Sequence, residues 1–317
     1  MKLFSPARIH LGFLEMNQSL PRFFGSLGLT ISKYGFEIEI KSSDKFKVVS
    51  PDSNLKKKVL SILLKFQKKM KIQFCEIKVN KFIPQHIGLG SGTQLSLSVG
   101  YLVSLFFDLK MTIDEIAVFL KRGKRSGIGI QSFKRGGFAV DLGKKKKSTG
   151  TPLELINLKW PDEWKIILIF QNKKEGVSGN SEIFEFKKVD LLPIKKNNCS
   201  ELLLKVIPGI MEKDFKTFCQ GIQLIQENMS ETFYGDKRIF ASKKIRQLSK
   251  NILKNKICGY GQTSWGPTSF IFCENSKKRN ELLKSLEKYI NLKNLDEINF
   301  VKVEGRNKGK ILLKGSE

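Results

Sequence analysis

The feature that most constrains this chain is a glycine-rich stretch that leads directly into an apolar, helix-like pattern. Residues 83–100 read IPQHIGLGSGTQLSLSVG, and from Leu95 onward apolar residues recur at intervals of three and four. A helix N-terminus carries unpaired N–H groups and a partial positive charge, and glycines before it let the backbone approach an anion closely. The stretch therefore predicts either a phosphate-binding loop or a helix entry whose glycines allow tight packing.

This stretch matches neither of two common nucleotide-binding patterns. It does not end in Gly-Lys-Ser/Thr, and its glycines do not follow Gly-x-Gly-x-x-Gly. The residues that offer phosphate-binding groups are Gly88, Gly90, Ser91, Gly92 and Thr93. Spacing alone leaves phosphate binding and packing equally open.

Length and composition describe a globular chain. The 317 residues, 40% of them hydrophobic, suffice for two domains with a core each. No apolar run reaches the roughly 18–20 residues of a membrane span, and the first residues form no signal-peptide core, so we expect a cytoplasmic protein without a membrane partner. Five scattered cysteines and two histidines argue against a disulfide framework and a zinc site.

The chain is strongly basic, with a formal net charge of +27. Such a charge is consistent with a phosphate-rich partner. The lysines, however, are spread over nearly every segment, and no RNA-binding motif or recognition helix stands out. We therefore favour compositional drift towards lysine over a specific nucleic-acid partner.

Hydrophobic periodicity predicts a mixed α and β chain. Strands are expected at residues 3–13, 27–32, 34–41, 46–49, 73–81, 137–142, 164–170, 257–260 and 268–273. Helices are expected at residues 52–70, after the glycine stretch, and from Thr112, where Glu115 would complete a capping box. The lysine run at 144–147, followed by STGTP, predicts either a domain boundary or a solvated hairpin tip.

Two further stretches give the glycine-rich one a context. They are PARIHLGFLEMN at 6–17 and GYGQTSWGPTSF at 259–270. Together the three motifs resemble the GHMP superfamily of small-molecule kinases. The resemblance implies an α+β, two-domain fold, with residues 1–155 similar to domain 2 of ribosomal protein S5 and residues 156–317 ferredoxin-like. It also implies a ligand in the cleft between the domains, with its phosphates on Gly88–Thr93.

One departure separates the chain from the kinases of that superfamily. Those kinases usually carry an Asp in a Ser-Gly-x-Asp motif that activates the hydroxyl nucleophile. The corresponding segment is SGIGIQSFKRGG, from Ser126 to Gly137, and the Asp position holds Gly129. Because a glycine cannot accept a proton, phosphoryl transfer would lose its usual activator.

The segments in which the chain differs from these kinases resemble another family of the same superfamily. In order, ARIHLGFL, RFFGSLGL, HIGLGSGTQL, RGKRSGIGI, FKRGGFAVD and GQTSWGPT are similar to the β-ribofuranosylaminobenzene 5′-phosphate synthase family. The resemblance implies a transferase of tetrahydromethanopterin biosynthesis. It would join phosphoribosyl pyrophosphate to 4-aminobenzoate or 4-hydroxybenzoate and release pyrophosphate and CO2. Two alternatives remain: a small-molecule kinase whose catalytic base lies elsewhere in the chain, and a basic RNA-binding protein.

That chemistry assigns roles to charged residues. Backbone N–H groups of the glycine stretch, with an expected Mg²⁺, would hold the pyrophosphate. Arg8, Arg122 and Arg125 would bind phosphate, although a solvated basic face explains the 121–135 cluster equally well.

Three further residues are candidates for the catalytic centre. Glu15 would face the cationic ribosyl carbon or bind Mg²⁺, and Arg22 would neutralise the leaving group. The family commonly has Asp at the position of Glu15. His10 lies on the same strand face as Arg8 and would contact the para substituent or a phosphate, or be a buried structural histidine.

The late glycine-rich stretch would bind the aromatic acid through Gln262, Ser264 and Trp265, although Trp265 could equally be a core residue. Asp141, at the end of a strand, is expected to be structural, with a catalytic or metal-binding role as the alternative. The expected partners are small molecules and a second copy of the chain in a homodimer.

Overall fold

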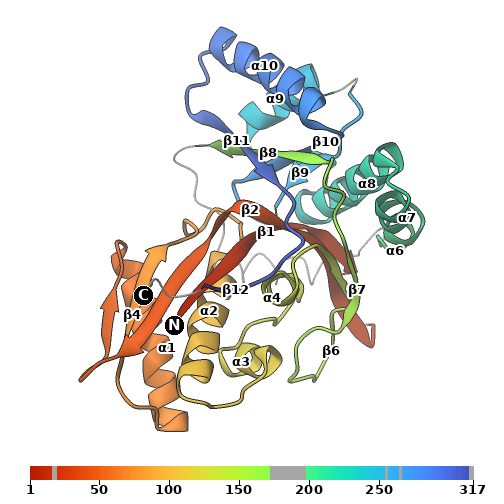
Figure 1. Ribbon diagram of the computed structural model, residues 1–317. Helices are drawn as coiled ribbons and strands as arrows, with labels where there is room; N and C mark the ends of the chain where they lie inside the picture. Colours follow the sequence, from red (N-terminus) through yellow and green to blue (C-terminus); the bar gives the residue numbers. More distant parts are fainter. Residues whose placement is uncertain (16–19, 172–197, 254–255, 264–265, 314–317) are drawn as a thin grey trace.

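The structure is a computed structural model that describes residues 1–15, 20–171, 198–253, 256–263 and 266–313. It contains two sheets, one above the other in Figure 1. The first has the order β12-β1-β2-β4-β3, with β5 and β6 also paired to β2 and β7 paired to β5. Its strands are β1 (Lys2–Glu15), β2 (Arg22–Ser42), β3 (Lys47–Val49), β4 (Cys75–Lys81), β5 (Phe138–Asp141), β6 (Lys144–Lys145), β7 (Glu154–Leu158) and β12 (Ile311–Leu313).

The long antiparallel pair β1–β2 forms the backbone of this sheet. The sequence predicts separate strands at 27–32 and 34–41, but they belong to one strand, β2. The apparent break is a bulge, because Pro6 pairs with Gly35 while the next residue pairs with Ile31. Lys33 takes up the extra length with a left-handed φ of 73°. A second register shift, between His10 and Gly12, bends β1 again.

Four helices cover one face of the first sheet, below β1 and β2 in Figure 1. They are α1 (Ser53–Met70), α2 (Ser91–Phe106), α3 (Ile113–Phe119) and α4 (Ile128–Lys134). Helix α3 has the predicted capping box, in which Thr112 and Glu115 bind each other's backbone N–H groups. Helix α2 packs an apolar surface that includes Leu95, Val99 and Val103 against the sheet.

The second sheet has the order β11-β8-β10-β9 and is antiparallel. Its strands are β8 (Lys165–Gln171), β9 (Tyr260–Gln262), β10 (Ser269–Cys273) and β11 (Ile298–Glu304). Strand β8 is buried on both faces, as its continuous apolar run predicts: Ile166 and Leu168 join the main core, and Ile167 and Ile169 join a second one.

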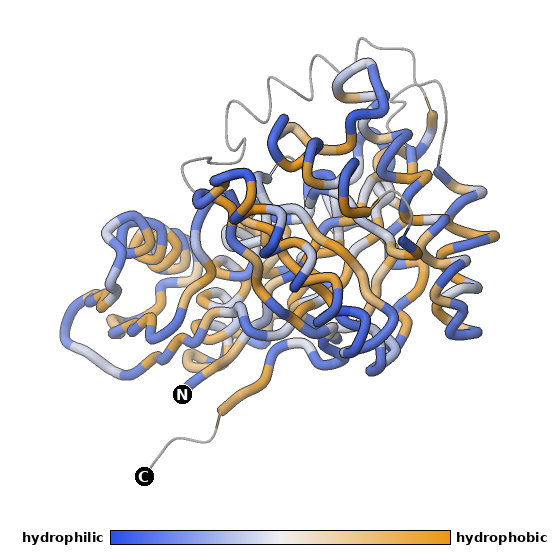
Figure 2. The backbone as a smooth tube through the Cα atoms, turned by 90° about the horizontal axis from the view of Figure 1, so that it is seen from above, coloured by the Kyte–Doolittle hydropathy of each residue, from blue (hydrophilic) through white to orange (hydrophobic). Residues whose placement is uncertain are grey.

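Helices lie on both faces of this second sheet (Figure 1). They are α6 (Cys199–Glu201), the π-helix η1 (Leu202–Val206), α7 (Ile207–Met211), α8 (Phe215–Tyr234), α9 (Lys243–Ile252) and α10 (Ser276–Leu292). Helix α8 contacts both β9 and β1, so it bridges the two sheets. Figure 2 shows apolar segments running through the centre of the molecule beneath more hydrophilic loops.

The predicted division into residues 1–155 and 156–317 stays a prediction. Strand β7 of the first sheet ends at Leu158, and β12 returns from the end of the chain to pair with β1. In the part of the chain that the structure describes, no helix is both long and apolar enough to cross a membrane.

Candidate active site

The glycine loop forms the predicted entry to helix α2. Gly90 is the N-cap residue with φ 84° and ψ 18°, and Gly88 has φ 82°, so both adopt the left-handed conformation that favours glycine. The N–H groups of Thr93 and Gln94 donate to the Gly90 carbonyl, each over 3.1 Å, so the N–H groups of Ser91 and Gly92 are the ones at this end that α-helical geometry leaves without an intrahelical acceptor. They stand at the positive end of the α2 dipole, where an anion is stabilised.

Arg8 lies directly beneath this loop. Its Nη1 donates to the Gly88 carbonyl over 2.7 Å, and its backbone N–H donates to the Leu89 carbonyl over 3.2 Å. A Cβ added at Gly90 would stand 3.2 Å from the Arg8 guanidinium carbon. The structure thus brings Arg8, Gly88 and Gly90 together, and any larger residue at Gly90 would press on the arginine.

The late glycine-rich segment closes over the same loop from the second sheet. Thr263 Oγ1 donates to the Gly88 carbonyl over 3.0 Å, and Thr268 Oγ1 donates to the Ile87 carbonyl over 2.6 Å. Gly266 packs so closely that an added Cβ would lie 2.5 Å from the Gly88 Cα. Sequence analysis missed these three roles, because only the fold shows that the two segments meet.

Of the three residues in that segment that are predicted to bind the aromatic acid, the structure describes one. Gln262 is buried, and its Oε1 accepts from the Ala241 N–H over 3.0 Å. Ser264 and Trp265 lie outside the described residues.

Arg122 supplies a second cation at the start of α2. Its Nε donates to Ser96 Oγ over 3.0 Å, and its Nη1 is 3.6 Å from where a Cβ on Gly92 would stand. Ser96 in turn donates to the Gly92 carbonyl over 2.9 Å. Burial lowers the pKa of Arg122, but an arginine stays charged at any physiological pH. Arg125 is half-buried in the loop between α3 and α4.

Gly129, at the start of α4, faces Thr93 of α2. A Cβ at Gly129 would lie 2.9 Å from Thr93 Cγ2, and the Gly129 carbonyl accepts from Gln94 Nε2 over 2.7 Å. The position where kinases of the superfamily hold their Asp is therefore closed by Thr93. Position 129 therefore offers no carboxylate, and Thr93 occupies the space that a side chain there would need.

Asp141 is structural, as expected. It is fully buried and accepts from the N–H groups of Gly127 and Gly143, each over 2.8 Å, and from the Ser26 hydroxyl. Burial raises the pKa of Asp141 to about 6, and these hydrogen bonds oppose that rise. Its oxygens fix the turn that precedes α4.

Glu15 and Arg22 lie further along the β1–β2 pair. Glu15 pairs with Phe24 across the strands, and Arg22 Nη1 donates to the Gly143 carbonyl over 2.9 Å. Seven residues of extended chain separate Glu15 from Arg8, roughly 20 Å at the rise of a strand. The described residues do not bring this pair to the glycine loop, and its catalytic role stays a prediction.

His10 lies beside the glycine loop, two residues along β1 from Arg8. Its backbone N–H donates to Thr263 Oγ1 over 3.0 Å. The side chain is 3% exposed, and neither ring nitrogen has a hydrogen-bond partner among the described residues. Burial, and secondly the charge of Arg8, lowers the pKa of His10 to about 3. The imidazole is therefore neutral at physiological pH.

Comparison with known proteins agrees with this geometry. Residues 54–137 match the family described as GHMP kinases N terminal domain. The β-ribofuranosylphenol 5′-phosphate synthase of Methanocaldococcus jannaschii is 30% identical over 297 residues, covering 84% of this chain and 88% of the relative. The synthase of the same name from Archaeoglobus fulgidus is 33% identical over 244 residues, covering 72% and 75%. The chain belongs to this synthase family.

Solved structures confirm the predicted α+β, GHMP-kinase-like fold. The phosphomevalonate kinase of Streptococcus pneumoniae superposes with a TM-score of 0.68 over 96% of this chain and 99% of that chain, at 12% identity. At this identity the likeness concerns the fold alone. Membership of the synthase family, together with Gly129, separates this chain from the kinases that share its architecture.

Proposed function

We propose that this member of the synthase family condenses phosphoribosyl pyrophosphate with a para-substituted benzoate, 4-hydroxybenzoate or 4-aminobenzoate, in tetrahydromethanopterin biosynthesis. The relatives are named for a ribofuranosylphenol product, so 4-hydroxybenzoate is the first acceptor to test. The observation that carries the proposal is the pair of arginines, Arg8 and Arg122, that contact the glycine loop and the first turn of α2, with Gly129 at the position of the kinase Asp.

The reaction balances without a further reactant. The bond between ribose C1 and pyrophosphate breaks, and its electron pair leaves with pyrophosphate. The ring carbon that bears the carboxylate forms the new C–C bond to C1. The carboxylate then leaves as CO2, and the electrons of its bond restore the aromatic ring.

The residues at the glycine loop suit the leaving group. The first N–H groups of α2, at Ser91 and Gly92, and the guanidinium of Arg122 would stabilise the charge that develops on pyrophosphate as the C1–O bond breaks. Arg8, held against the Gly88 carbonyl, adds charge while it fixes the loop. Arg125 is proposed to extend the site towards the ribose phosphate.

Magnesium is proposed to arrive with the substrate. The described residues include no group of three His, Cys, Asp or Glu that could hold a metal ion. Mg²⁺ commonly binds through substrate phosphates with only one or two carboxylates from the protein. A phosphate loop with Ser91 and Thr93 hydroxyls and few acids fits such a substrate-borne ion, which would help to neutralise the leaving pyrophosphate.

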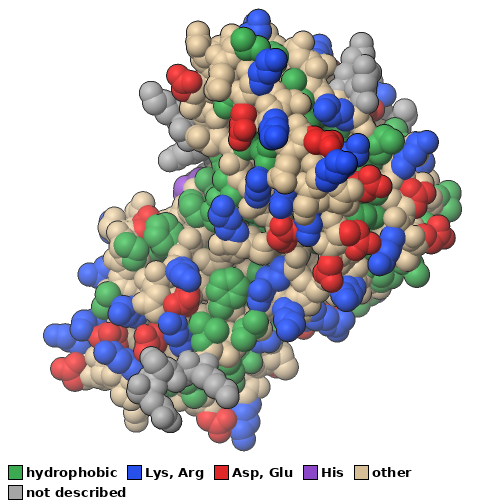
Figure 3. Space-filling model, turned by 45° about the horizontal axis from the view of Figure 1, so that its top comes forward, with side chains coloured by type: hydrophobic (Ala, Val, Ile, Leu, Met, Phe, Trp, Pro, Cys, Tyr) green, Lys and Arg blue, Asp and Glu red, His purple; other side chains and the backbone are tan. Residues whose placement is uncertain are grey.

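The two alternatives have less support. A kinase would need a proton acceptor where Gly129 packs on Thr93. A nucleic-acid-binding protein would need a gathered basic surface, whereas on the face in Figure 3 Lys and Arg side chains alternate with acidic ones. We also propose a cytoplasmic, homodimeric enzyme whose partners are small molecules.

The test is release of labelled CO2 from carboxyl-labelled 4-hydroxybenzoate or 4-aminobenzoate with phosphoribosyl pyrophosphate and Mg²⁺. We expect one CO2 per pyrophosphate formed. Arg122→Gln should lower turnover at least a hundredfold, about 2.7 kcal/mol of transition-state stabilisation. Arg135→Gln is the matched control, since Arg135 is exposed and paired with Glu154. Stoichiometric ADP release from ATP with a small alcohol would instead support the kinase.

A further inference from the structure

A pocket opens beside the glycine loop, between strand β1 and helix α8. Its enclosed part measures about 30 Å³, and the rest of the pocket is open to solvent. Its walls include Phe13 from β1 and Met229, Phe233 and Tyr234 from α8. Flat aromatic side chains and a methionine form a surface suited to an aromatic ring. We call this space the acceptor pocket.

Most polar side chains that line the acceptor pocket already bind the protein's own backbone. Gln226 donates to the Leu11 carbonyl over 2.6 Å and accepts from the Gln262 N–H over 2.9 Å. Ser230 Oγ donates to the Asp236 carbonyl over 2.8 Å and accepts from the Ile239 N–H over 2.9 Å. These groups shape the pocket, and their bonds would have to break before they could bind a ligand.

His10 is different. It lines the same pocket, its ring lies 4.7 Å from the Phe13 ring, and both of its nitrogens are buried without a partner in the described part of the chain. A buried polar group without a partner is costly and rare in native proteins. Such a group beside an aromatic pocket indicates a hydrogen bond that a ligand completes.

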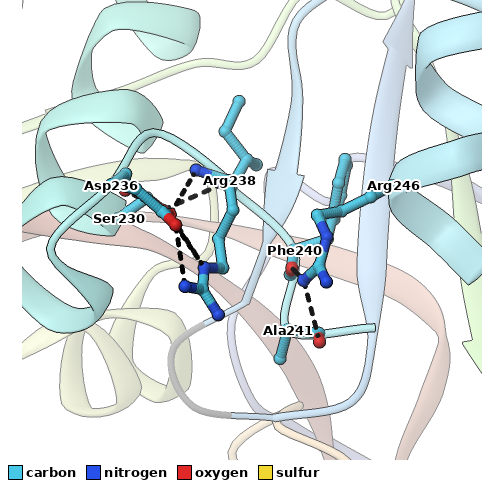
Figure 4. Close-up of polar contacts among 7 residues, drawn as sticks. Ser230, Asp236, Arg238, Phe240, Ala241 and Arg246 are labelled. Carbon is cyan, nitrogen blue, oxygen red and sulfur yellow. Dashed lines mark hydrogen bonds and ion pairs between the residues drawn. The ribbon is translucent and has the colours of Figure 1, made fainter. Parts of the chain in front are cut away.

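The outer wall of the pocket is fixed in advance. After α8 the chain runs through the loop of residues 235–242, which Figure 4 shows in close-up. Arg238 makes a two-pronged contact with the Asp236 carboxylate, with 2.7 Å from Nε to Oδ1 and from Nη2 to Oδ2.

A second arginine holds the far end of this loop. Arg246 Nη1 donates to the carbonyls of Phe240 and Ala241 over 2.7 and 3.1 Å, as Figure 4 shows. A wall held at both ends can orient a rigid ligand with little loss of entropy on binding.

The position of the pocket suits the acceptor of the proposed reaction. Arg8 and His10 are two residues apart on β1, roughly 7 Å along a strand, so the pocket adjoins the phosphate loop. Thr263 Oγ1 connects them, since it accepts from the His10 N–H and donates to the Gly88 carbonyl. A ring in the acceptor pocket would therefore lie next to a ribose whose pyrophosphate occupies the loop.

We propose that the acceptor pocket receives the para end of the para-substituted benzoate, with the rest of the ring in its open mouth, and that His10 accepts a hydrogen bond from the para hydroxyl or amino group. This inference rests on the proposed function. A neutral imidazole can accept such a bond, and accepting it strengthens electron donation from the para group into the ring, which activates the attacking carbon. A neutral imidazole also carries no positive charge that would stabilise the benzoate carboxylate and so oppose its loss as CO2.

The lowered pKa of His10, about 3, agrees with this role. At any pH used for the assay the imidazole stays neutral, so one nitrogen remains an acceptor.

The experiment compares binding of 4-hydroxybenzoate and 4-fluorobenzoate by calorimetry, with pyrophosphate and Mg²⁺ present to fill the phosphate site. Fluorine is close in size to a hydroxyl and cannot donate a hydrogen bond. Wild type should prefer 4-hydroxybenzoate about tenfold, which corresponds to about 1.4 kcal/mol. His10→Phe should bind both ligands alike, whereas Met229→Leu, a change in the apolar wall, should keep the preference.

Turnover supplies a second readout. His10→Phe should raise the KM for 4-hydroxybenzoate at least tenfold and change the KM for phosphoribosyl pyrophosphate less than twofold. If His10→Phe does not unfold cooperatively, His10→Leu takes its place, because it also removes both nitrogens. The comparison of 4-hydroxybenzoate with 4-fluorobenzoate on the wild-type enzyme tests the role of His10 even if neither variant folds.

The outcomes separate the two proposals. A wild-type enzyme that releases no CO2 from either benzoate overturns the proposed function. An active enzyme that binds 4-fluorobenzoate as well as 4-hydroxybenzoate, or a His10 variant that keeps the tenfold preference, overturns the role of His10 alone.

Discussion

At the scale of single residues, the contact between Gly129 and Thr93 closes the position at which related kinases carry their Asp. The loss of the Asp is visible in the sequence, but the loss of its space is not. Thr93 approaches so closely that even a methyl group at Gly129 would be 2.9 Å from Thr93 Cγ2. Replacing Gly129 by Asp would therefore not restore a proton acceptor in a working position.

This contact can be tested through stability. Gly129→Ala in helix α4 would ordinarily stabilise the protein by up to about 1 kcal/mol, because alanine favours the helix. Here the added methyl overlaps Thr93, and we expect a net loss of about 1–3 kcal/mol in the free energy of unfolding. Thr93→Ser removes the facing methyl and should recover at least half of that loss in the double variant, as measured by urea unfolding. Simple additivity of the two changes would show that the residues do not press on each other.

At the scale of elements, the site is formed where two glycine-rich loops dock. Gly266 and Gly88 touch backbone to backbone, and two threonine hydroxyls bind carbonyls of the glycine loop. These contacts fix the loop that presents the α2 N-terminus. We therefore expect the late loop to influence phosphate binding through the shape of the glycine loop.

Gly266→Ala tests this docking. The new methyl would lie 2.5 Å from the Gly88 Cα, so the loops must separate. We expect the affinity for pyrophosphate, measured by calorimetry with Mg²⁺, to fall at least tenfold. Gly150→Ala is the control, because the only group near its added Cβ in the described structure is Ser148 Oγ at 3.9 Å. Equal affinities in both variants would mean that the docking leaves the phosphate loop unchanged.

The same elements show what sequence can and cannot predict. The glycine loop, the capping box of Thr112 and the buried strand β8 were predictable because each depends on neighbours within a few residues. The bulge at Lys33 was read as a break, since a left-handed residue inside a strand resembles a turn. The threonine contacts and the pocket around His10 depend on which distant segments meet, and a single chain's periodicity does not contain that information.

At the scale of the whole molecule, the question is what the charge of +27 does. The chain has 57 basic and 30 acidic residues. In helix α1, the lysines at 56, 57 and 58 are exposed, while Leu55, Val59 and Phe66 face the core. A solvated face of this kind needs no partner, and Figure 3 shows acidic groups among the basic ones.

If the charge is mostly compositional, nucleic acids should bind only through their phosphates. We expect a Kd on the order of 10⁻⁴–10⁻⁶ M for duplex DNA and for RNA at physiological salt, with no sequence preference. Binding should weaken steeply between 50 and 200 mM salt, because it depends on counterion release. Fluorescence anisotropy with two unrelated sequences measures both properties.

Replacing Lys56, Lys57 and Lys58 together by Gln should weaken this binding further and leave CO2 release unchanged, since α1 lies outside the site. Nanomolar binding that persists at 200 mM salt and distinguishes the two sequences would instead give the basic surface a nucleic-acid partner of its own, separate from the transferase site.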